Sequence, residues 1–373
     1  MSSTGSLVRY AEGRLKQLDA KGQRRSLSPT QRSPGSRAMR GARALVSFCD
    51  NDYLALSCDP RLVEAAARAA QTFGVGAGAS RLISGDCPLN EELEAALARK
   101  KGTEACRVFG SGYLANIGAV PALVGRGDTI VMDELSHACM HAGARLSKAE
   151  IRIFRHNDVE HARSLLADAP GQVLLFTETV FSMDGDLAPL DALSEICDEH
   201  DAWLMTDDAH GLGIIDRPNP APLQMGTLSK AAGAYGGYVC APAPVADLLT
   251  SRARSFVYTT GLPAPVLASA IEALAIMEAE PERAERALSN AALFCRLMNL
   301  PAPESVIVPV IVGDEARALS FSAALDAAGY LVTAIRPPTV PEGTSRLRFT
   351  FTAGHSTEDV EGLVQALKGA MSQ

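Results

Sequence analysis

From Phe48 onward, short apolar runs alternate along the chain with segments whose apolar residues recur at a helical period. Segments such as "RLVEAAARAAQTF" and "LNEELEAALARK" show the helical period, whereas "DTIVMD", "QVLLFTE" and "AWLMTD" are compact apolar runs typical of buried strands. This alternation predicts βα units, which form a mostly parallel sheet with helices on both faces. Ligands of such sheets bind where the strands end, so candidate chemistry is expected just after each apolar run.

A second alternation begins past about Leu262, where "SVIVPVIVG", "YLVTAI" and "RLRFTFT" are separated by helical patterns. The length of 373 residues is enough for about two domains. We therefore expect a large domain at 47–262, a smaller C-terminal α/β domain at 263–373 and an N-terminal arm at 1–46.

The N-terminal arm is basic, with ten Lys and Arg against two Asp and Glu between Met1 and Ser47. Its stretch "SLSPTQRSPGSR" has the Ser, Pro and Gly content of a loop, which favours a polar extension. Two other interpretations remain open. Arg24 and Arg25 could face an anionic substrate, and the Arg- and Ser-rich segment could be a transit peptide.

Composition narrows the classes of partner. The net charge of −8 disfavours nucleic acid as the general partner. No apolar run approaches the ~20 residues of a membrane span, and the first residues lack the apolar core of a signal peptide, so we expect a cytoplasmic protein without a membrane partner. The eight cysteines occur singly with no CxxC pair, which disfavours both a zinc site and a disulfide framework.

The residues that follow the apolar runs have complementary chemistry. Lys230 stands in "GTLSKAAGAYGG", where the hydroxyls of Thr227 and Ser229 precede the lysine, so the segment is not a P-loop. Asp207 and His210 follow "AWLMT". A lysine amine, hydroxyls and helix-start N–H groups for a phosphate, an aspartate in an apolar strand and nearby histidines together predict a site for pyridoxal 5'-phosphate (PLP).

Eight segments, in this order, resemble the α-oxoamine synthases, which are fold-type I PLP-dependent transferases. They are "SFCDNDYLALS", "GVGAGASRLISG", "FGSGYLAN", "DELSHACMHAG", "TETVFSMDGDLAPL", "DDAHGLG", "GTLSKAAGAYGG" and "IRPPTVPEGTSRLRFTFTAGH". The resemblance covers nearly everything from Ser47 to His355. It implies a large PLP-binding domain, a smaller C-terminal domain and a homodimer.

The resemblance also implies roles for single residues. Lys230 matches the lysine that forms the Schiff base and moves the Cα proton, and Asp207 matches the partner of the pyridine nitrogen. His210 matches the group bonded to the ring oxygen. His137 matches the histidine that stacks on the ring beside the substrate, with a helical histidine packed against the sheet as the alternative. Further cofactor contacts are expected at Gly112, Tyr113, Ser182, Thr227 and Ser229.

Substrate contacts follow from the same resemblance. Asn51 and Arg336 match the pair near the substrate carboxylate, where a guanidinium can bind two oxygens at once. Thr339 and Arg24 match contacts to the acyl substrate, with Arg25 as the alternative to Arg24.

The segment "RPPTVP" most resembles the branch of the family that joins L-alanine to pimeloyl-CoA or pimeloyl-acyl carrier protein with loss of CO2, in biotin biosynthesis. Glycine C-acetyltransferase, 5-aminolevulinate synthase and serine palmitoyltransferase activities are the alternatives within the family. A noncatalytic partner that retains the fold and a nucleotide-binding α/β protein are alternatives from other classes.

Two features depart from the expected pattern. The segment from His210 to Lys230 is shorter than the family norm, and "PLQMGT" replaces its usual strand, which puts the local strand geometry in doubt. His137 and His141 are four residues apart and could chelate a metal, but no third ligand lies nearby in the sequence, so we expect none.

Overall fold

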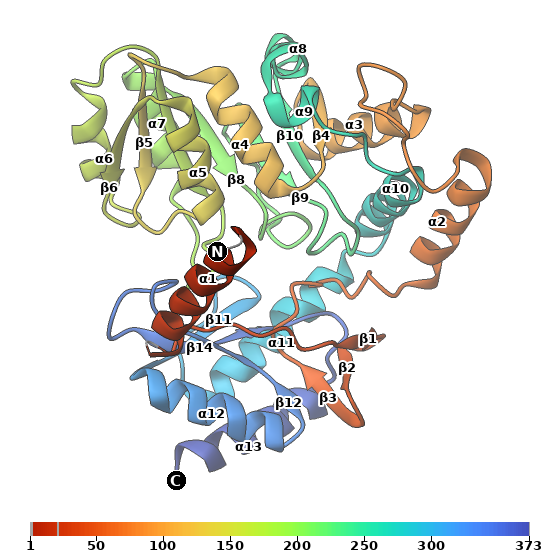
Figure 1. Ribbon diagram of the computed structural model, residues 1–373, viewed down its shortest axis with the longest axis vertical. Coiled ribbons are helices and arrows are strands. Elements are labelled where there is room, and N and C mark those ends of the chain that lie inside the picture. The colour runs from red at the N-terminus through yellow and green to blue at the C-terminus, as the bar shows by residue number, and fades with distance from the viewer. Residues whose placement is uncertain (1–2, 21, 373) are drawn as a thin grey trace.

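The computed structural model describes residues 3–20 and 22–372 and contains three sheets (Figure 1). The largest has seven strands in the order β4-β10-β9-β8-β7-β5-β6. Only β10 is antiparallel to its neighbours, which confirms the mostly parallel sheet. Its strands are β4 (Ala105–Phe109), β5 (Thr129–Asp133), β6 (Glu150–Phe154), β7 (Val173–Glu178), β8 (Trp203–Asp207), β9 (Leu223–Thr227) and β10 (Gly237–Ala241).

Helices cover both faces of this sheet, as the alternation predicts. One face packs against α4 (Gly112–Leu123), α5 (Ala138–Ser147), α8 (Ala243–Arg252) and α9 (Arg254–Val257). The other packs against α2 (Pro60–Phe73), α3 (Pro88–Lys101), α6 (Val159–Leu166), α7 (Leu190–Glu199) and α10 (Ala264–Ala279). In β5, Ile130 and Met132 face the first set while Val131 faces the second, because successive strand residues point to opposite faces.

The C-terminal part has a core of its own. A three-stranded antiparallel sheet in the order β11-β14-β13 packs against three helices, and Phe294, Phe349 and Phe351 lie fully buried between them. The strands are β11 (Ile307–Gly313), β13 (Thr333–Ile335) and β14 (Ser345–Thr350). The helices are α11 (Glu282–Met298), α12 (Glu315–Ala327) and α13 (Thr357–Met371).

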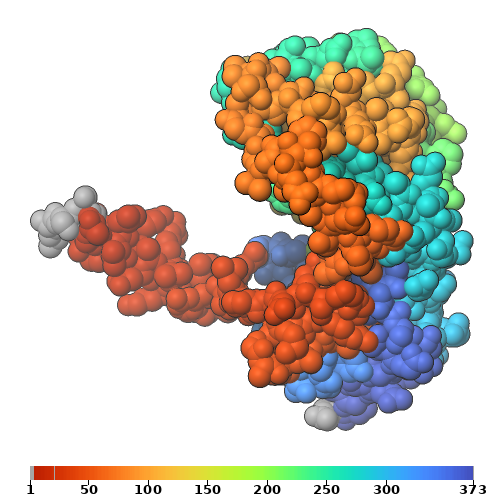
Figure 2. Space-filling view, turned by 90° about the vertical axis from the view of Figure 1, so that its right-hand side faces the viewer, coloured from red at the N-terminus to blue at the C-terminus, as the bar shows by residue number. Residues whose placement is uncertain are grey.

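The N-terminal arm is more regular than its composition suggests. Residues 3–20 form the helix α1 (Ser3–Ala20), which extends away from the rest of the molecule (Figure 2). In the stretch "SLSPTQRSPGSR", for which composition predicts a loop, residues 26–30 have no regular structure, but from Gln31 the chain forms a hairpin of β1 (Gln31–Ser33) and β2 (Arg37–Arg40), in which Gly35 and Ser36 adopt the positive φ angles of a tight turn. The hairpin continues through β3 (Arg43–Ser47), and β3 pairs in parallel with β12 (Tyr330–Leu331).

The arm residues 31–47 thus share a four-stranded sheet with the C-terminal part of the chain. The division at 46/47 and 262/263 stays a prediction. The doubt about "PLQMGT" is resolved, because β9 forms there and pairs with both β8 and β10.

Candidate active site

The ends of the parallel strands surround a cavity of about 280 Å³. Eight of the residues expected to contact PLP line it: Gly112, Tyr113, His137, Asp207, His210, Thr227, Ser229 and Lys230. They come from β8, β9, the first turn of α4 and the loops that follow β5, β8 and β9. Parallel strands end at one edge of the sheet, so residues far apart in sequence meet there.

Lys230 lies at one side of this cavity in a short chain of hydrogen bonds. Its Nζ is 2.9 Å from Nε2 of His210, whose Nδ1 is 2.6 Å from the Tyr53 hydroxyl. The Tyr53 hydroxyl in turn donates to Oδ1 of Asn51 at 3.1 Å. With Lys230 donating to Nε2 and Nδ1–H donating to the Tyr53 oxygen, each of these three contacts has one donor and one acceptor.

Burial shapes the acid–base properties of this chain. It lowers the pKa of Lys230, although Asp207 and Glu178 oppose the effect. Burial lowers the pKa of His210 well below its usual range, and Lys230 and Arg348 lower it further. The Lys230 amine is therefore closer to a usable base than an exposed lysine.

Asp207 is almost fully buried and is held by two neutral donors. Asn116 Nδ2 donates to its Oδ2 at 3.0 Å, and the backbone N–H of Ala209 donates to its Oδ1 at 3.0 Å. Glu178 stands beside it in the adjacent strand and accepts a hydrogen bond from the N–H of Ser182 at 3.2 Å. Burial raises the pKa of both carboxyl groups, and the charge of Asp207 raises the pKa of Glu178 further.

His137 is the N-cap of α5. Its Nδ1 accepts from the N–H of Cys139 at 3.2 Å and lies 2.8 Å from the Cys139 thiol. Asn116 Nδ2 donates to that sulfur at 3.1 Å as well as to Asp207. A continuous hydrogen-bond path therefore joins Asp207 to His137 through Asn116 and Cys139. Burial lowers the pKa of His137, and a neutral ring is the form that leaves Nδ1 free to accept.

The opposite end of the cavity suits a phosphate. The N–H groups of Gly112 and Tyr113 belong to the first turn of α4 and have no acceptor within the helix. The Thr227 and Ser229 hydroxyls lie 2.8 Å apart beside this turn. A Cβ at Gly112 would lie only 3.3 Å from Thr227 Cβ, so glycine keeps this corner open.

Two expected residues lie close to the cavity without lining it. Ser182 is buried and bonded to Glu178 through its backbone. Asn51 is reached through Tyr53. Ser182 thus joins the site through its backbone N–H, and Asn51 joins it through the Tyr53 hydroxyl.

The structure does not bring Arg336 to Asn51. Arg336 Nη1 donates to the Gly22 carbonyl at 3.2 Å and lies 3.8 Å from Glu315. The buried guanidinium beside Asn51 belongs to Arg348, whose Nη1 donates to Asn51 Oδ1 at 3.3 Å. The role of Asn51 and Arg336 at a substrate carboxylate stays a prediction, and Arg348 is a second candidate because it lies beside Asn51.

The two expected acyl contacts also lie away from the cavity. Arg24 pairs with Asp19 at 2.9 Å, and about half of its side chain is exposed. Thr339 is exposed and donates its N–H to the Arg336 carbonyl. Within residues 3–20 and 22–372, no group of three His, Cys, Asp or Glu side chains is arranged to hold a metal ion.

Sequence reasoning missed four residues of the site: Tyr53, Asn116, Cys139 and Arg348. A signal for Arg348 was present in "RLRFTFT", where arginine occupies alternate positions of an apolar strand. Burying a guanidinium is costly unless it has partners, so such a pattern points to a site. The position of Cys139 depends on how α5 docks, and nothing in its sequence context indicates it.

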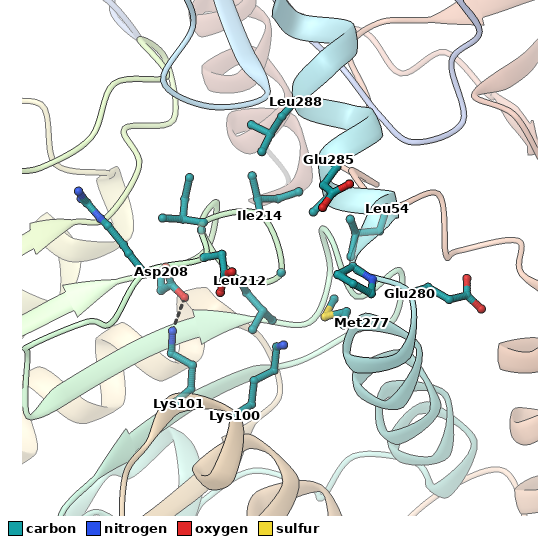
Figure 3. Close-up of a pocket in the computed structure, with 17 residues that line it drawn as sticks. Leu54, Lys100, Lys101, Asp208, Leu212, Ile214, Met277, Glu280, Glu285 and Leu288 are labelled. Atoms are coloured by element: carbon teal, nitrogen blue, oxygen red, sulfur yellow. Dashed lines mark hydrogen bonds and ion pairs between the residues drawn. The ribbon is translucent and has the colours of Figure 1, made fainter.

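A second cavity of about 290 Å³ lies on the other side of the turn that follows β8 (Figure 3). Asp208 and Lys101 line it and form an ion pair at 2.7 Å, with both side chains largely buried. The Thr179 hydroxyl donates to the other Asp208 oxygen at 2.6 Å. The adjacent residues Asp207 and Asp208 therefore face two different cavities.

Comparisons with known proteins show the family and the fold. Residues 43–367 match the family model of the class I and II aminotransferases. The chain is 57% identical over 365 residues to the 8-amino-7-oxononanoate synthase of Methylobacterium radiotolerans, covering 97% of this chain and 98% of that protein. Serine palmitoyltransferase of Sphingomonas wittichii superposes with a TM-score of 0.92 and 29% identity, over 100% of this chain and 98% of that one.

A serine palmitoyltransferase structure from S. paucimobilis, solved with a bound PLP-myriocin aldimine, superposes with a TM-score of 0.91 and 27% identity, over 98% of both chains. Fold and site together define a PLP-dependent enzyme of fold type I. The chain belongs to the class I and II aminotransferase family and, within it, to the 8-amino-7-oxononanoate synthases, which makes it a PLP-dependent acyltransferase. No helix in the described part of the chain is long and apolar enough to cross a membrane.

The residues present fit PLP. The cavity offers a buried amine at Lys230, a carboxyl at Asp207 and a helix start flanked by hydroxyls. One Glu178 oxygen is buried without a hydrogen-bond partner among the described residues, which leaves polar capacity for a bound group.

Proposed function

We propose that this enzyme condenses L-alanine with a pimeloyl thioester, carried by CoA or by acyl carrier protein, to give 8-amino-7-oxononanoate, CO2 and the free thiol, in biotin biosynthesis. The observation that carries the proposal is the buried Lys230 amine between His210 and the phosphate corner, in a chain 57% identical to a relative of that name. The "RPPTVP" segment supports the choice of alanine and a pimeloyl donor over the other members of the family.

We assign the cofactor contacts by chemistry. The first turn of α4, Thr227 and Ser229 hold the phosphate, and Asp207 keeps a proton on the pyridine nitrogen. When bound, PLP withdraws electrons from the Cα of an attached amino acid, which favours loss of the Cα proton and later of CO2. Lys230 Nζ binds the aldehyde carbon and then removes and returns the Cα proton, for which its lowered pKa suits it.

The other residues orient the substrate. Arg348 is the buried cation beside Asn51, and we assign it to the alanine carboxylate. His210 and Tyr53 keep the Lys230 amine in place through their hydrogen bonds. His137 closes the cavity at the start of α5, where its ring can pack on the cofactor.

We also propose a homodimer. Several large apolar side chains are exposed on the described surface, including Val75, Ile83 and Tyr258. Tyr113 lines the cavity and is itself half exposed. A second copy of the chain that packed over Tyr113 would help to enclose the site. Light scattering of the purified protein measures the assembly, and a monomer at micromolar concentration would contradict it.

A mass-spectrometric assay tests the proposed reaction. The holoenzyme is incubated with L-alanine and pimeloyl-CoA, or with pimeloyl-acyl carrier protein, and the C9 amino ketone, the free thiol and CO2 are measured. Glycine with acetyl-CoA or succinyl-CoA and serine with palmitoyl-CoA are the comparison pairs. A higher kcat/KM with any of those pairs would move the chain to another member of the family.

A further inference from the structure

Two loops at the carboxyl edge of the sheet carry expected cofactor residues, and one histidine connects them. The loop after β5 runs from Asp133 to His137, and the turn after β7 runs from Ser182 to Asp186. Between them lies His156, in the segment that follows β6. His156 is outside the cavity, so the assigned chemistry does not use it.

Both ring nitrogens of His156 meet carboxylates. Nδ1 is 3.0 Å from Oδ1 of Asp133, and Nε2 is 2.7 Å from Oδ2 of Asp186. The ring packs edge-on against Phe181, with centroids 4.3 Å apart. Asp133 is fully buried, whereas about a quarter of the His156 side chain is exposed.

The neighbouring residue reinforces the same bridge. The N–H of Asn157 donates to Asp133 Oδ2 at 2.9 Å, and its side chain donates to Asp186 Oδ2 at 2.9 Å. Glu134 accepts from the backbone N–H of His156 at 2.9 Å and is the third carboxylate of the cluster. The charged groups that meet the His156 ring are Asp133 and Asp186, and Glu134 meets its backbone N–H.

The turn is held from its other side by the C-terminal sheet. Arg346 binds Asp184 at 2.5 Å, and Arg348 Nε donates to the Ser182 carbonyl at 2.5 Å. Ser305 donates to the Gly185 carbonyl at 2.7 Å. Toward the loop that carries His137, the turn is tied by the side chains of His156 and Asn157, and Glu178 in addition meets the backbone of both His137 and Ser182.

We propose that His156 is a positioning residue whose imidazolium bridges Asp133 and Asp186 and so fixes the spacing between the His137 loop and the Ser182 turn. A neutral imidazole has one N–H and can donate to only one carboxylate, so the double contact requires the charged ring. The link to cofactor binding rests on the proposed function, whereas the charged bridge itself does not.

The bridge has a pH signature. Burial lowers the pKa of His156, but the hydrogen bonds and charges of Asp133 and Asp186 outweigh burial and raise it to about 10. A histidine whose folded pKa is raised stabilises the fold fully below its unfolded pKa, near 6.5, and loses that contribution as pH rises through about 10.

The test compares the wild-type holoenzyme with His156→Gln, and uses His200→Gln, at the end of α7, as the matched control. Melting temperature is measured from pH 6 to 10.5. We expect the wild type to exceed His156→Gln by several degrees at pH 6 to 7, with the gap closing toward pH 10.5. His200→Gln should track the wild type throughout.

The second readout is the dissociation constant of PLP. We expect His156→Gln to raise this constant by about tenfold, an effect of the size found between residues that share one hydrogen-bond network. A gap that is the same at pH 6.5 and pH 10 would overturn the charged bridge. A pH-dependent gap with unchanged PLP affinity would overturn the positioning role and leave a purely structural ion pair.

Asp186→Asn provides the same test if His156→Gln fails to fold. It should show the same closing gap, and the double variant His156→Gln/Asp186→Asn should cost less than the sum of the two single changes. If the wild-type enzyme does not catalyse the condensation, the proposed function is refuted. The ion bridge of His156 with Asp133 and Asp186 would still stand, because melting temperatures do not depend on turnover.

Discussion

Asp207 and Asp208 are adjacent in sequence, face two different cavities and have opposite surroundings. Asp208 is paired directly with Lys101 at 2.7 Å and accepts from Thr179. Asp207 receives only neutral donors, Asn116 and the N–H of Ala209, within hydrogen-bond distance. One carboxylate is already neutralised by the protein, while the other is held in place and left without a direct cation.

The contrast extends to the lysines. Lys101 meets a carboxylate, whereas Lys230 meets the uncharged ring of His210. A buried charge without a direct counter-ion is costly, and the pKa of Lys230 is lowered accordingly. We infer that the Lys101 cavity is structural and that the Lys230 cavity keeps its groups unpaired for a ligand that supplies the missing charges.

The largest expected effect comes from Lys230. Lys230→Ala should lower kcat by on the order of 10³-fold or more, because it removes both the covalent anchor and the group that moves the Cα proton. The measurement is steady-state formation of the amino ketone. Lys100→Ala, on the rim of the other cavity, is the matched control and should retain activity. Comparable turnover in both variants would contradict the inference that the Lys230 cavity is catalytic and the Lys101 cavity is structural.

The next effect concerns stability. Lys101→Met leaves Asp208 as a buried charge without its partner, and should reduce the free energy of unfolding by about 3 to 5 kcal/mol. Lys101→Met/Asp208→Asn should recover much of that loss, since the uncompensated charge is gone. Denaturant unfolding measures both. If the double variant loses as much free energy of unfolding as Lys101→Met alone, the Lys101–Asp208 pair contributes more to stability than the mutual neutralisation of the two charges.

A third prediction separates two arginines. Arg348→Ala should cost about 2 to 4 kcal/mol in alanine recognition, roughly 30- to 1000-fold in kcat/KM, because a buried charged pair with the carboxylate is lost. Arg336→Ala should leave kcat/KM nearly unchanged, since Arg336 binds the Gly22 carbonyl. Kinetics at varied alanine concentration distinguish the two, and the reverse order would restore the expectation drawn from the sequence.

The sequence predicted the architecture and the strand-end residues because both depend on local patterns. Alternating apolar runs and helical periods define βα units, and polar residues after the runs at Asp207 and Lys230 fall at one edge of the sheet. The proposed role of Lys230 needed no tertiary information beyond that rule.

The differences between the sequence expectations and the structure occur where tertiary contacts decide. In β14, Arg346 and Arg348 are two residues apart and share a face, which directs both toward the turn at 182–184. Arg336 follows β13, and its side chain reaches Gly22 instead. The second half of the loop predicted in the arm is a hairpin, because pairing with β3 and, through it, β12 supplies backbone partners that composition does not reveal.

The smallest effect tests how the uncharged contacts of the site are maintained. Cys139 connects His137 to Asn116, and Asn116 connects to Asp207, so the thiol is one link between the ring-stacking residue and the buried carboxyl. Cys139→Ala removes that link while leaving the backbone N–H that also binds Nδ1 of His137. It should weaken PLP binding by about 1 kcal/mol, the usual net value of one hydrogen bond.

Cys139→Ser keeps a donor and an acceptor in the same place and should bind PLP within about twofold of the wild type. Because burial lowers the pKa of His137 below its ordinary value, we expect a neutral ring at pH 7 to 8.5, and the difference between the two variants should be constant over that range. Equilibrium titration with PLP over that range measures it. Equal weakening in both variants would show that sulfur packing, and not the hydrogen-bond path, holds His137 in place.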